Sequence, residues 1–263
     1  MPSHAHDLTN SPAPRNGSDL SRRRMLAGVG GLLALAGLAA CSAPQAERQR
    51  ASATEADEAP RTTDEALARL REGNARYVQG TAQHPRQNAE ARAAVAEHQQ
   101  PWALIHGCVD SRVSPELLFD QGVGDLFVTR TAGEVLDDTL VGSMEFAVGS
   151  PYEVPVIVIL GHTACGAVTG TVKALAENPK DPQAPGEIAD FIDEIAPVAR
   201  EVKPEGDEAA HIDKVVRANA AAVAEKLVER SAIIRQAVQA GRTKVVAAVY
   251  DLNTGEVEWD VTG

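Results

Sequence analysis

Aromatic residues are rare in this chain, with four Phe, three Tyr and two Trp among 263 residues. The hydrophobic fraction of 44% is therefore mainly aliphatic, and the length is sufficient for one sizeable globular core. Cysteine is rare too, and three residues in all exclude a small scaffold held together by several disulfides. Two of them, Cys108 and Cys165, lie well inside the chain and are expected as free thiols rather than as one disulfide.

Positive charge is also in short supply. Twenty-five Lys and Arg stand against 37 Asp and Glu, which gives a formal net charge of −12. Residues 1–41 hold four arginines and two aspartates, so the remaining residues carry about −14. Such an acidic body repels a phosphate backbone, and we expect no nucleic-acid binding.

The apolar run near the N-terminus, from Met25 to Ala40, is shorter than the roughly 20 residues of a membrane-spanning helix. Its basic start and apolar middle are typical of a signal peptide, and Arg22 and Arg23 indicate twin-arginine export. The run ends in Leu-Ala-Ala-Cys at Cys41, which resembles a bacterial lipobox whose cysteine receives lipid. The alternatives are an uncleaved anchor or cleavage beyond Cys41.

These features predict three parts of the chain and a location. Residues 1–41 form the signal peptide, and residues 42–63, which lack bulky apolar side chains, form a disordered tether. Residues 64–263 form the folded domain. We expect an exported protein of the cell envelope, held by lipid at the outer face of the cytoplasmic membrane.

The folded part has the pattern of an α/β protein. Helical spacing begins near Asp64, with Thr63 or Asp64 as the cap, and a second helix is expected over Asn88 to His98. A long helical region precedes Gly241, and the C-terminal residues favour an antiparallel edge strand. Four apolar runs separated by helices or longer loops predict a mainly parallel four-stranded sheet flanked by helices: residues 102–108, 125–130, 154–162 and 244–252.

Metal-binding residue types follow two of these strands. Cys108 ends the first, and "GHTACGAV" (161–168) places His162 at the end of the third, three residues before Cys165. Ligands gather at the carboxyl ends of parallel strands, and two thiolates with one imidazole favour Zn²⁺. Three protein ligands leave a position for water, which bound zinc activates as a nucleophile. The alternatives are a closed structural site, or two buried cysteines beside an unrelated histidine.

Asp110 and Arg112 lie two and four residues after Cys108. Asp110 can accept a proton or hydrogen bond from a water on the metal, or become the fourth ligand of an inactive state. The planar guanidinium of Arg112 matches a carboxylate in bidentate fashion, so a pair between them would hold Asp110 off the metal. An ordinary surface ion pair is the other interpretation.

With these motifs in place, residues 64–257 resemble a β-class carbonic anhydrase. The resemblance includes "LREGNARYVQG", "CVDSRVSPELLFDQGVGDLFV", "GSMEFAV", "VIVILGHTACGAV" and "YDLNTGEV", in that order. It implies zinc on Cys108, His162 and Cys165, an Asp110–Arg112 dyad, and reversible hydration of carbon dioxide to bicarbonate and a proton. It further implies a homodimer or higher homo-oligomer with active sites near the subunit interface.

The same resemblance suggests substrate contacts at Gln99, Val113 and Gly166. Two other functions stay open: hydrolysis of carbon disulfide or carbonyl sulfide on the same fold, and a non-catalytic zinc-binding envelope lipoprotein closed by Asp110. The chain departs from the family where many members read Arg-Asn-Ala-Gly-Asn, because "RTAGE" places Thr131 and Glu134 there. Ile105 also replaces a tryptophan of the bicarbonate-regulated subgroup, which argues against an inhibitory bicarbonate pocket. His106 is expected in the core, and His106 and His211 are weak candidates for carrying protons to solvent.

Overall fold

The structure is a computed structural model, and it describes residues 58–262. The predicted signal peptide, most of the predicted tether, Arg22, Arg23 and Cys41 lie outside these residues. None of the helices within residues 58–262 is both long and apolar enough to cross a bilayer.

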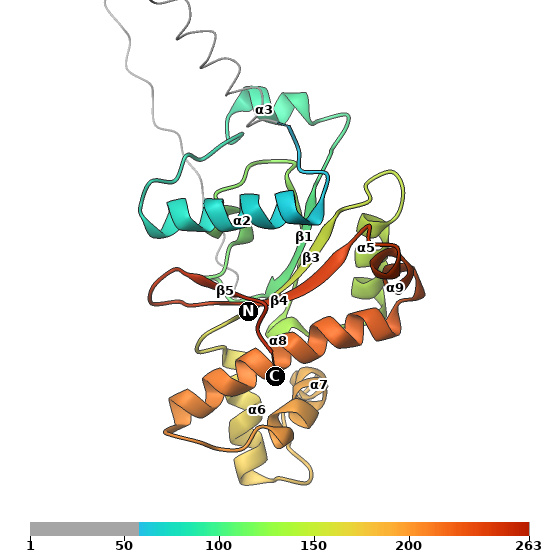
Figure 1. Ribbon diagram of the computed structural model, residues 1–263. Helices are drawn as coiled ribbons and strands as arrows, with labels where there is room; N and C mark the ends of the chain where they lie inside the picture. Colours follow the sequence, from blue (N-terminus) through green and yellow to red (C-terminus); the bar gives the residue numbers. More distant parts are fainter. Residues whose placement is uncertain (1–57, 263) are drawn as a thin grey trace, which may run out of the picture. The chain divides into compact units, whose positions relative to one another are not determined.

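A five-stranded sheet in the order β2-β1-β3-β4-β5 forms the centre of the fold (Figure 1). The strands β1, β2, β3 and β4 are parallel, and β5 pairs antiparallel with β4 at one edge. This arrangement confirms the predicted α/β fold, its parallel sheet and its antiparallel C-terminal strand. The strands are β1 (Ala103–Cys108), β2 (Leu126–Thr131), β3 (Val156–His162), β4 (Lys244–Tyr250) and β5 (Val257–Trp259).

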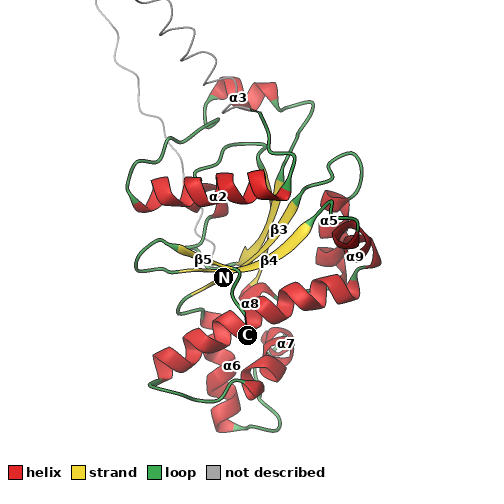
Figure 2. Cartoon of the chain, viewed as in Figure 1, coloured by secondary structure: helices red, strands yellow, loops and turns green. Residues whose placement is uncertain are grey.

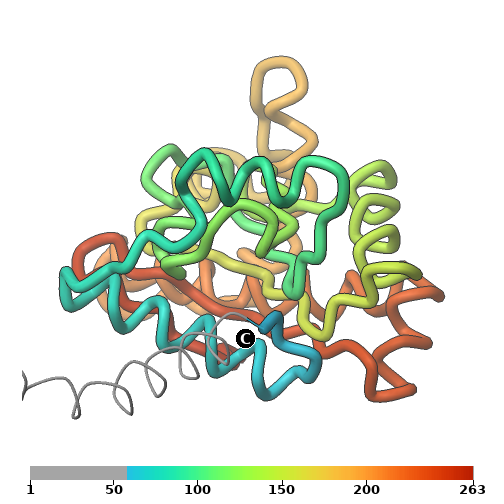
Figure 3. The backbone as a smooth tube through the Cα atoms, turned by 90° about the horizontal axis from the view of Figure 1, so that it is seen from above, coloured from blue at the N-terminus to red at the C-terminus, as the bar shows by residue number. Residues whose placement is uncertain are grey.

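Helices cover both faces of the sheet (Figure 2). Successive residues of a strand point to opposite faces, so the continuous apolar run of β3 supplies two cores. Ile157 and Ile159 pack into the core under α5 and α8, whereas Val158 and Leu160 pack into the core under α2. Seen from above, α2 (cyan) and α5 (yellow-green) accordingly lie on different sides of the strands (Figure 3).

Helices or helical turns lie between successive parallel strands, and two further helices precede β1. The helical segments are α2 (Thr63–Val78), α3 (Ala89–Ala94), α4 (Pro115–Leu118), the 3₁₀ turn η1 (Ala132–Glu134), α5 (Asp138–Val148), α6 (Gly166–Glu177), α7 (Ile188–Glu201), α8 (Glu208–Arg230) and α9 (Ala232–Gln239).

Side-chain caps set two boundaries differently from the prediction. The first helix is capped by Thr62, not by Thr63 or Asp64, because Thr62 and Glu65 form a reciprocal capping box. The long helical region before Gly241 is divided at Ser231, which ends α8 and caps α9. The Ser231 hydroxyl accepts from the backbone N–H of Ile234 and donates to Glu145. The second predicted helix is shorter than expected and is limited to α3.

Candidate metal centre

Strand register brings the predicted metal ligands to one point. Gly107 of β1 pairs with Leu160 of β3, so Cys108 and His162 end neighbouring strands at the same edge of the sheet. Cys165 caps α6, which begins at the next residue. The side chains of all three residues are buried, with 0% exposure for His162, 1% for Cys165 and 4% for Cys108.

The free atoms of these side chains suit a soft divalent cation. Cys108 and Cys165 are free thiols with their Sγ atoms 4.0 Å apart, so they do not form the alternative disulfide. His162 Nδ1 lies 3.0 Å from the Thr163 carbonyl oxygen, which can only accept, so Nδ1 carries the proton. Nε2 then carries a free lone pair, and this buried atom has no hydrogen-bond partner among residues 58–262. Two sulfurs and one such nitrogen fit the chemistry of zinc.

The two thiols lie within hydrogen-bonding distance of each other. The hydrogen bond between them lowers the pKa of Cys108 and raises the pKa of Cys165. A backbone N–H also points at the sulfur of Cys108, from Gly133 at 3.5 Å. Cys108 is therefore the thiol that loses its proton first, as a metal-binding thiolate must.

The turn after β2 adds a fourth potential ligand, Glu134. One ligand atom each from Cys108, Glu134, His162 and Cys165 lies within 4.8 Å of the others. Glu134 is 1% exposed, and burial raises the pKa of its carboxyl group well above the usual value. The sequence marked this position only as a departure from a family pattern, and its burial beside the thiols was not predicted.

Hydrogen bonds from neighbouring elements hold the ligand loops. Arg130 Nε donates to the Cys108 carbonyl oxygen at 2.7 Å, and its Nη2 donates to the carbonyl oxygen of Asp110. His106 is fully buried, and its Nε2 lies 2.9 Å from the Glu134 carbonyl oxygen. Burial lowers the pKa of His106, which confirms its predicted core role and argues against a role in proton transfer to solvent. Arg130 was not identified from the sequence.

Asp110 and Arg112 form the predicted bidentate pair. Arg112 Nε lies 2.9 Å from Asp110 Oδ1 and Nη2 lies 2.6 Å from Oδ2, while the backbone N–H of Arg112 also donates to Oδ1. Hydrogen bonding from Arg112 holds the pKa of Asp110 far below its usual value, so the carboxylate stays ionised. Asp110 Oδ2 is 3.9 Å from His162 Nε2, which places the ionised carboxylate beside the ligand set.

Similar proteins identify the family. A family model described as carbonic anhydrase matches residues 103–257. A carbonic anhydrase of Mycolicibacterium smegmatis is 41% identical over 196 residues, which cover 72% of this chain and 89% of the relative. The chain belongs to the β-class carbonic anhydrase family.

Solved structures agree with this family assignment. The β-carbonic anhydrase of Coccomyxa in complex with acetazolamide matches with a TM-score of 0.56 and 26% identity, over 84% of this chain and 86% of that one. A tetrameric β-carbonic anhydrase of Sordaria macrospora shares the fold with a TM-score of 0.56 and 24% identity, over 72% and 93% of the two chains. The relatives and the shared fold together support a carbonic anhydrase.

The predicted substrate contacts of this β-class carbonic anhydrase are not all brought together. Val113 is buried and Gly166 exposed, and both directly follow the loops that carry Asp110 and Cys165. Gln99 instead precedes β1, where it donates to the Tyr152 hydroxyl at 3.3 Å and lines a cavity of about 570 Å³ with Trp102. Cys108 ends β1, so the length of the strand, roughly 16 Å at about 3.3 Å per residue, separates Gln99 from the ligands.

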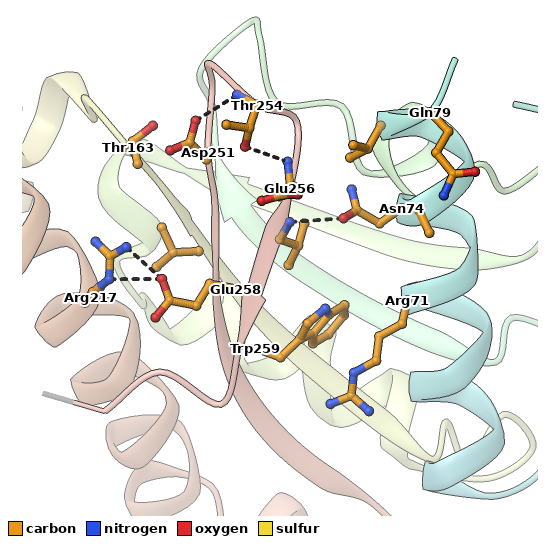
Figure 4. A pocket seen from close by; sticks show the side chains of 14 residues that line it. Arg71, Asn74, Gln79, Thr163, Arg217, Asp251, Thr254, Glu256, Glu258 and Trp259 are labelled. Carbon is orange, nitrogen blue, oxygen red and sulfur yellow. Dashed lines mark hydrogen bonds and ion pairs between the residues drawn. The ribbon is translucent and has the colours of Figure 1, made fainter. Parts of the chain in front are cut away.

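A larger cavity of about 690 Å³ lies between α2 and the β4–β5 hairpin and does not include the three predicted ligands (Figure 4). Several of its charged groups are bound within the chain. Arg217 pairs with Glu258 at 2.7 Å, and Asp251 accepts from the backbone N–H groups of Asn253 and Thr254. Thr163, which follows His162, lines this cavity, so the cavity borders the candidate metal centre without containing its predicted ligands.

We expect Gly133→Ala to damage the metal centre. Gly133 has φ +66°, and a Cβ there would lie 2.6 Å from Ile195 Cδ1 and 3.1 Å from Ala167 Cβ. The turn must shift, which moves the N–H group from the Cys108 sulfur and lowers the free energy of unfolding by about 1–3 kcal/mol. Chemical denaturation and metal analysis would measure both effects. A variant with unchanged stability and metal content would contradict this account of the turn.

Gly142→Ala is the matched control. Gly142 lies within α5, and an added Cβ meets no atom within 4 Å. Because alanine favours a helix interior over glycine, the free energy of unfolding should stay equal or rise by up to about 1 kcal/mol.

Proposed function

We propose that the protein is a zinc enzyme that catalyses the reversible hydration of carbon dioxide to bicarbonate and a proton. The observation that carries this proposal is the buried pair of thiols beside an unpartnered His162 Nε2, with Asp110 held next to them by Arg112. Cys108, His162 and Cys165 would hold the metal. Zinc would supply the Lewis acid that activates water at neutral pH.

The dyad gives Asp110 a defined task in this reaction. Both carboxylate oxygens are engaged by Arg112, so Asp110 is oriented as a hydrogen-bond acceptor and not released toward the thiols. Its side chain is 16% exposed and that of Arg112 is 56% exposed, so the dyad lies at the rim of the buried ligand set. A proton accepted there has a short path to solvent.

Assembly would account for the position of Gln99. One chain keeps Gln99 at the amino end of β1, away from the ligands at the carboxyl end. A partner subunit is then needed to bring a Gln99 side chain to the carbon dioxide site. Val113 and Gly166 would line that site from the same chain as the metal ligands. We therefore propose a homo-oligomer, at least a dimer.

The N-terminal residues support a proposed location outside the cytoplasm. Twin-arginine export carries folded proteins, so zinc would be bound before the thiols of Cys108 and Cys165 meet an oxidising exterior. Lipid on Cys41 would then hold the acidic domain at the membrane surface.

Replacing either ligand cysteine should remove metal and activity together, because a hydroxyl group is a poor substitute for a thiolate ligand. We expect about one zinc per chain in the wild type and little zinc in Cys108→Ser and Cys165→Ser. Metal analysis combined with stopped-flow carbon dioxide hydration would test this. Cys41→Ser is the matched control, since it removes the third cysteine and should keep zinc and turnover. Full zinc in both ligand variants would refute the proposed ligand set.

Arg112→Ala should reduce carbon dioxide hydration at least about tenfold while zinc stays bound. The loss follows because Asp110 is no longer oriented and is free to approach the metal. The pKa of Asp110 is depressed by Arg112, so the wild-type dyad is present above the usual Asp pKa and is lost only as pH falls well below it. In Arg112→Ala, acid loss should begin at a higher pH.

Arg112→Lys separates charge from geometry. Lysine keeps the positive charge but lacks the planar fork, so activity should fall between those of Arg112→Ala and the wild type. A near-normal pH profile of hydration in Arg112→Ala would count against the dyad.

Replacing both Arg22 and Arg23 by Lys should leave folded, zinc-loaded protein in the cytoplasm, because the twin-arginine pair is the proposed address. Cell fractionation with a radioactive lipid label would measure location and acylation in the same experiment. Cys41→Ala should lose the label and serve as its control. Normal export of the double-lysine variant would exclude this route, and an unlabelled wild type would exclude the anchor.

A further inference from the structure

Glu134 is a buried carboxyl group that the proposed reaction does not use. Within the described part of the chain, its Oε1 is buried without a hydrogen-bond partner, and its Oε2 has only a long contact of 3.5 Å from Asn219 Nδ2. An interior polar atom left unpaired costs about 1–3 kcal/mol, so such a group calls for a partner.

The position of this carboxyl group identifies that partner as the metal. One ligand atom each from Glu134, Cys108, His162 and Cys165 lies within 4.8 Å of the others. Zinc bonds of about 2.0–2.3 Å imply ligand separations of roughly 3.3–3.8 Å in a tetrahedron, so the set needs to contract by only about 1 Å. Asp110 is not a member of this group and is bound by Arg112 instead.

Glu134 is held in this position by a backbone conformation that residues with a side chain disfavour. Glu134 has φ +57°, a left-handed conformation that costs a residue with a side chain roughly 1–2 kcal/mol. Hydrogen bonds from outside the turn hold it there. His106 Nε2 lies 2.9 Å from the Glu134 carbonyl oxygen, and Asn219 Nδ2 donates to the Gly133 carbonyl oxygen at 2.9 Å.

The charge of the completed set is acceptable in a protein interior. Zinc with two thiolates and a neutral imidazole has no net charge, and an added carboxylate makes it −1. A site of three cysteines and one histidine carries the same charge and is a common closed zinc site. Without a cation, an ionised Glu134 carboxylate would be a buried charge with no compensating positive group.

We infer that Glu134 is a fourth protein ligand of the metal, and that in the resting protein it occupies the position that water must enter. The inference rests on the proposed function for the metal itself. Asp110 then remains available as a proton acceptor, and departure of the Glu134 carboxylate opens the site. The proposed closing group is buried, whereas the dyad lies at the rim of the ligand set.

Cobalt substitution tests the inference through a readout other than turnover. Cobalt(II) in a tetrahedral site absorbs visible light, and azide changes that spectrum when it can enter an open position. We expect azide at neutral pH to leave the spectrum of the cobalt-loaded wild type unchanged. Asp110→Asn should also stay unchanged, whereas Glu134→Gln should show a saturable change. Glu145→Gln, which removes a half-buried carboxylate bound to Ser231, is the matched control and should behave as the wild type does.

Three results would each overturn the assignment of Glu134. They are an azide response in the wild type, an azide response in Asp110→Asn, and the absence of a response in folded, cobalt-loaded Glu134→Gln. If Glu134→Gln fails to fold, the wild type and Asp110→Asn still test the inference. An unchanged cobalt spectrum in both proteins supports Glu134 as the fourth ligand, and an azide response in either one excludes it. A wild type that takes up neither cobalt nor zinc would refute the proposed metal itself, which separates that failure from failure of this inference.

Discussion

The low polarity of the space at the carboxyl end of β1 and β3 is the constraint on which the metal centre depends. Parallel pairing of these central strands forces Cys108 and His162 into the same buried corner, and helix α6 starts where Cys165 completes the set. In such an environment an ionised thiol is unfavourable unless a cation compensates it. The sheet therefore does more than position the candidate ligands, because their burial would make a bound cation part of the stable state.

A second set of contacts holds the loops that surround this corner. Arg130 binds the backbone carbonyl oxygens of Cys108 and Asp110, which fixes the loop that carries the dyad. From the opposite face, Asn219 of α8 holds the turn after β2. Outer contacts of this kind usually matter for metal affinity nearly as much as the ligands do. They come from β2 and α8, elements that supply none of the three predicted ligands.

Patterns local in the sequence predicted the fold and the three candidate metal ligands. Features that depend on contacts between distant residues could not be predicted in this way. Apolar runs located the strands, and a cysteine or histidine at a strand end indicated the corner where they meet. Burial of Glu134 depends on Asn219, 85 residues further along the chain, and no local pattern encodes it. Ser231 divides a continuous helical pattern for a similar reason, because Glu145 of α5 binds its hydroxyl. Gln99 matches a family motif, yet a single chain keeps it at the far end of β1.

Two carboxyl groups near the same ligands illustrate how environment divides chemical roles. Asp110 lies at the rim with a guanidinium on both oxygens, and Arg112 holds its pKa low, so it stays ionised and acts as a hydrogen-bond acceptor. Glu134 has no cation among its hydrogen-bonding partners in the described residues, and burial raises its pKa. A metal ion would reverse that preference by supplying the missing positive charge. If Glu134 closes the site as inferred, metal binding and packing of the turn after β2 occur together. The metal would then help His106 to hold Glu134 in its strained conformation at φ +57°.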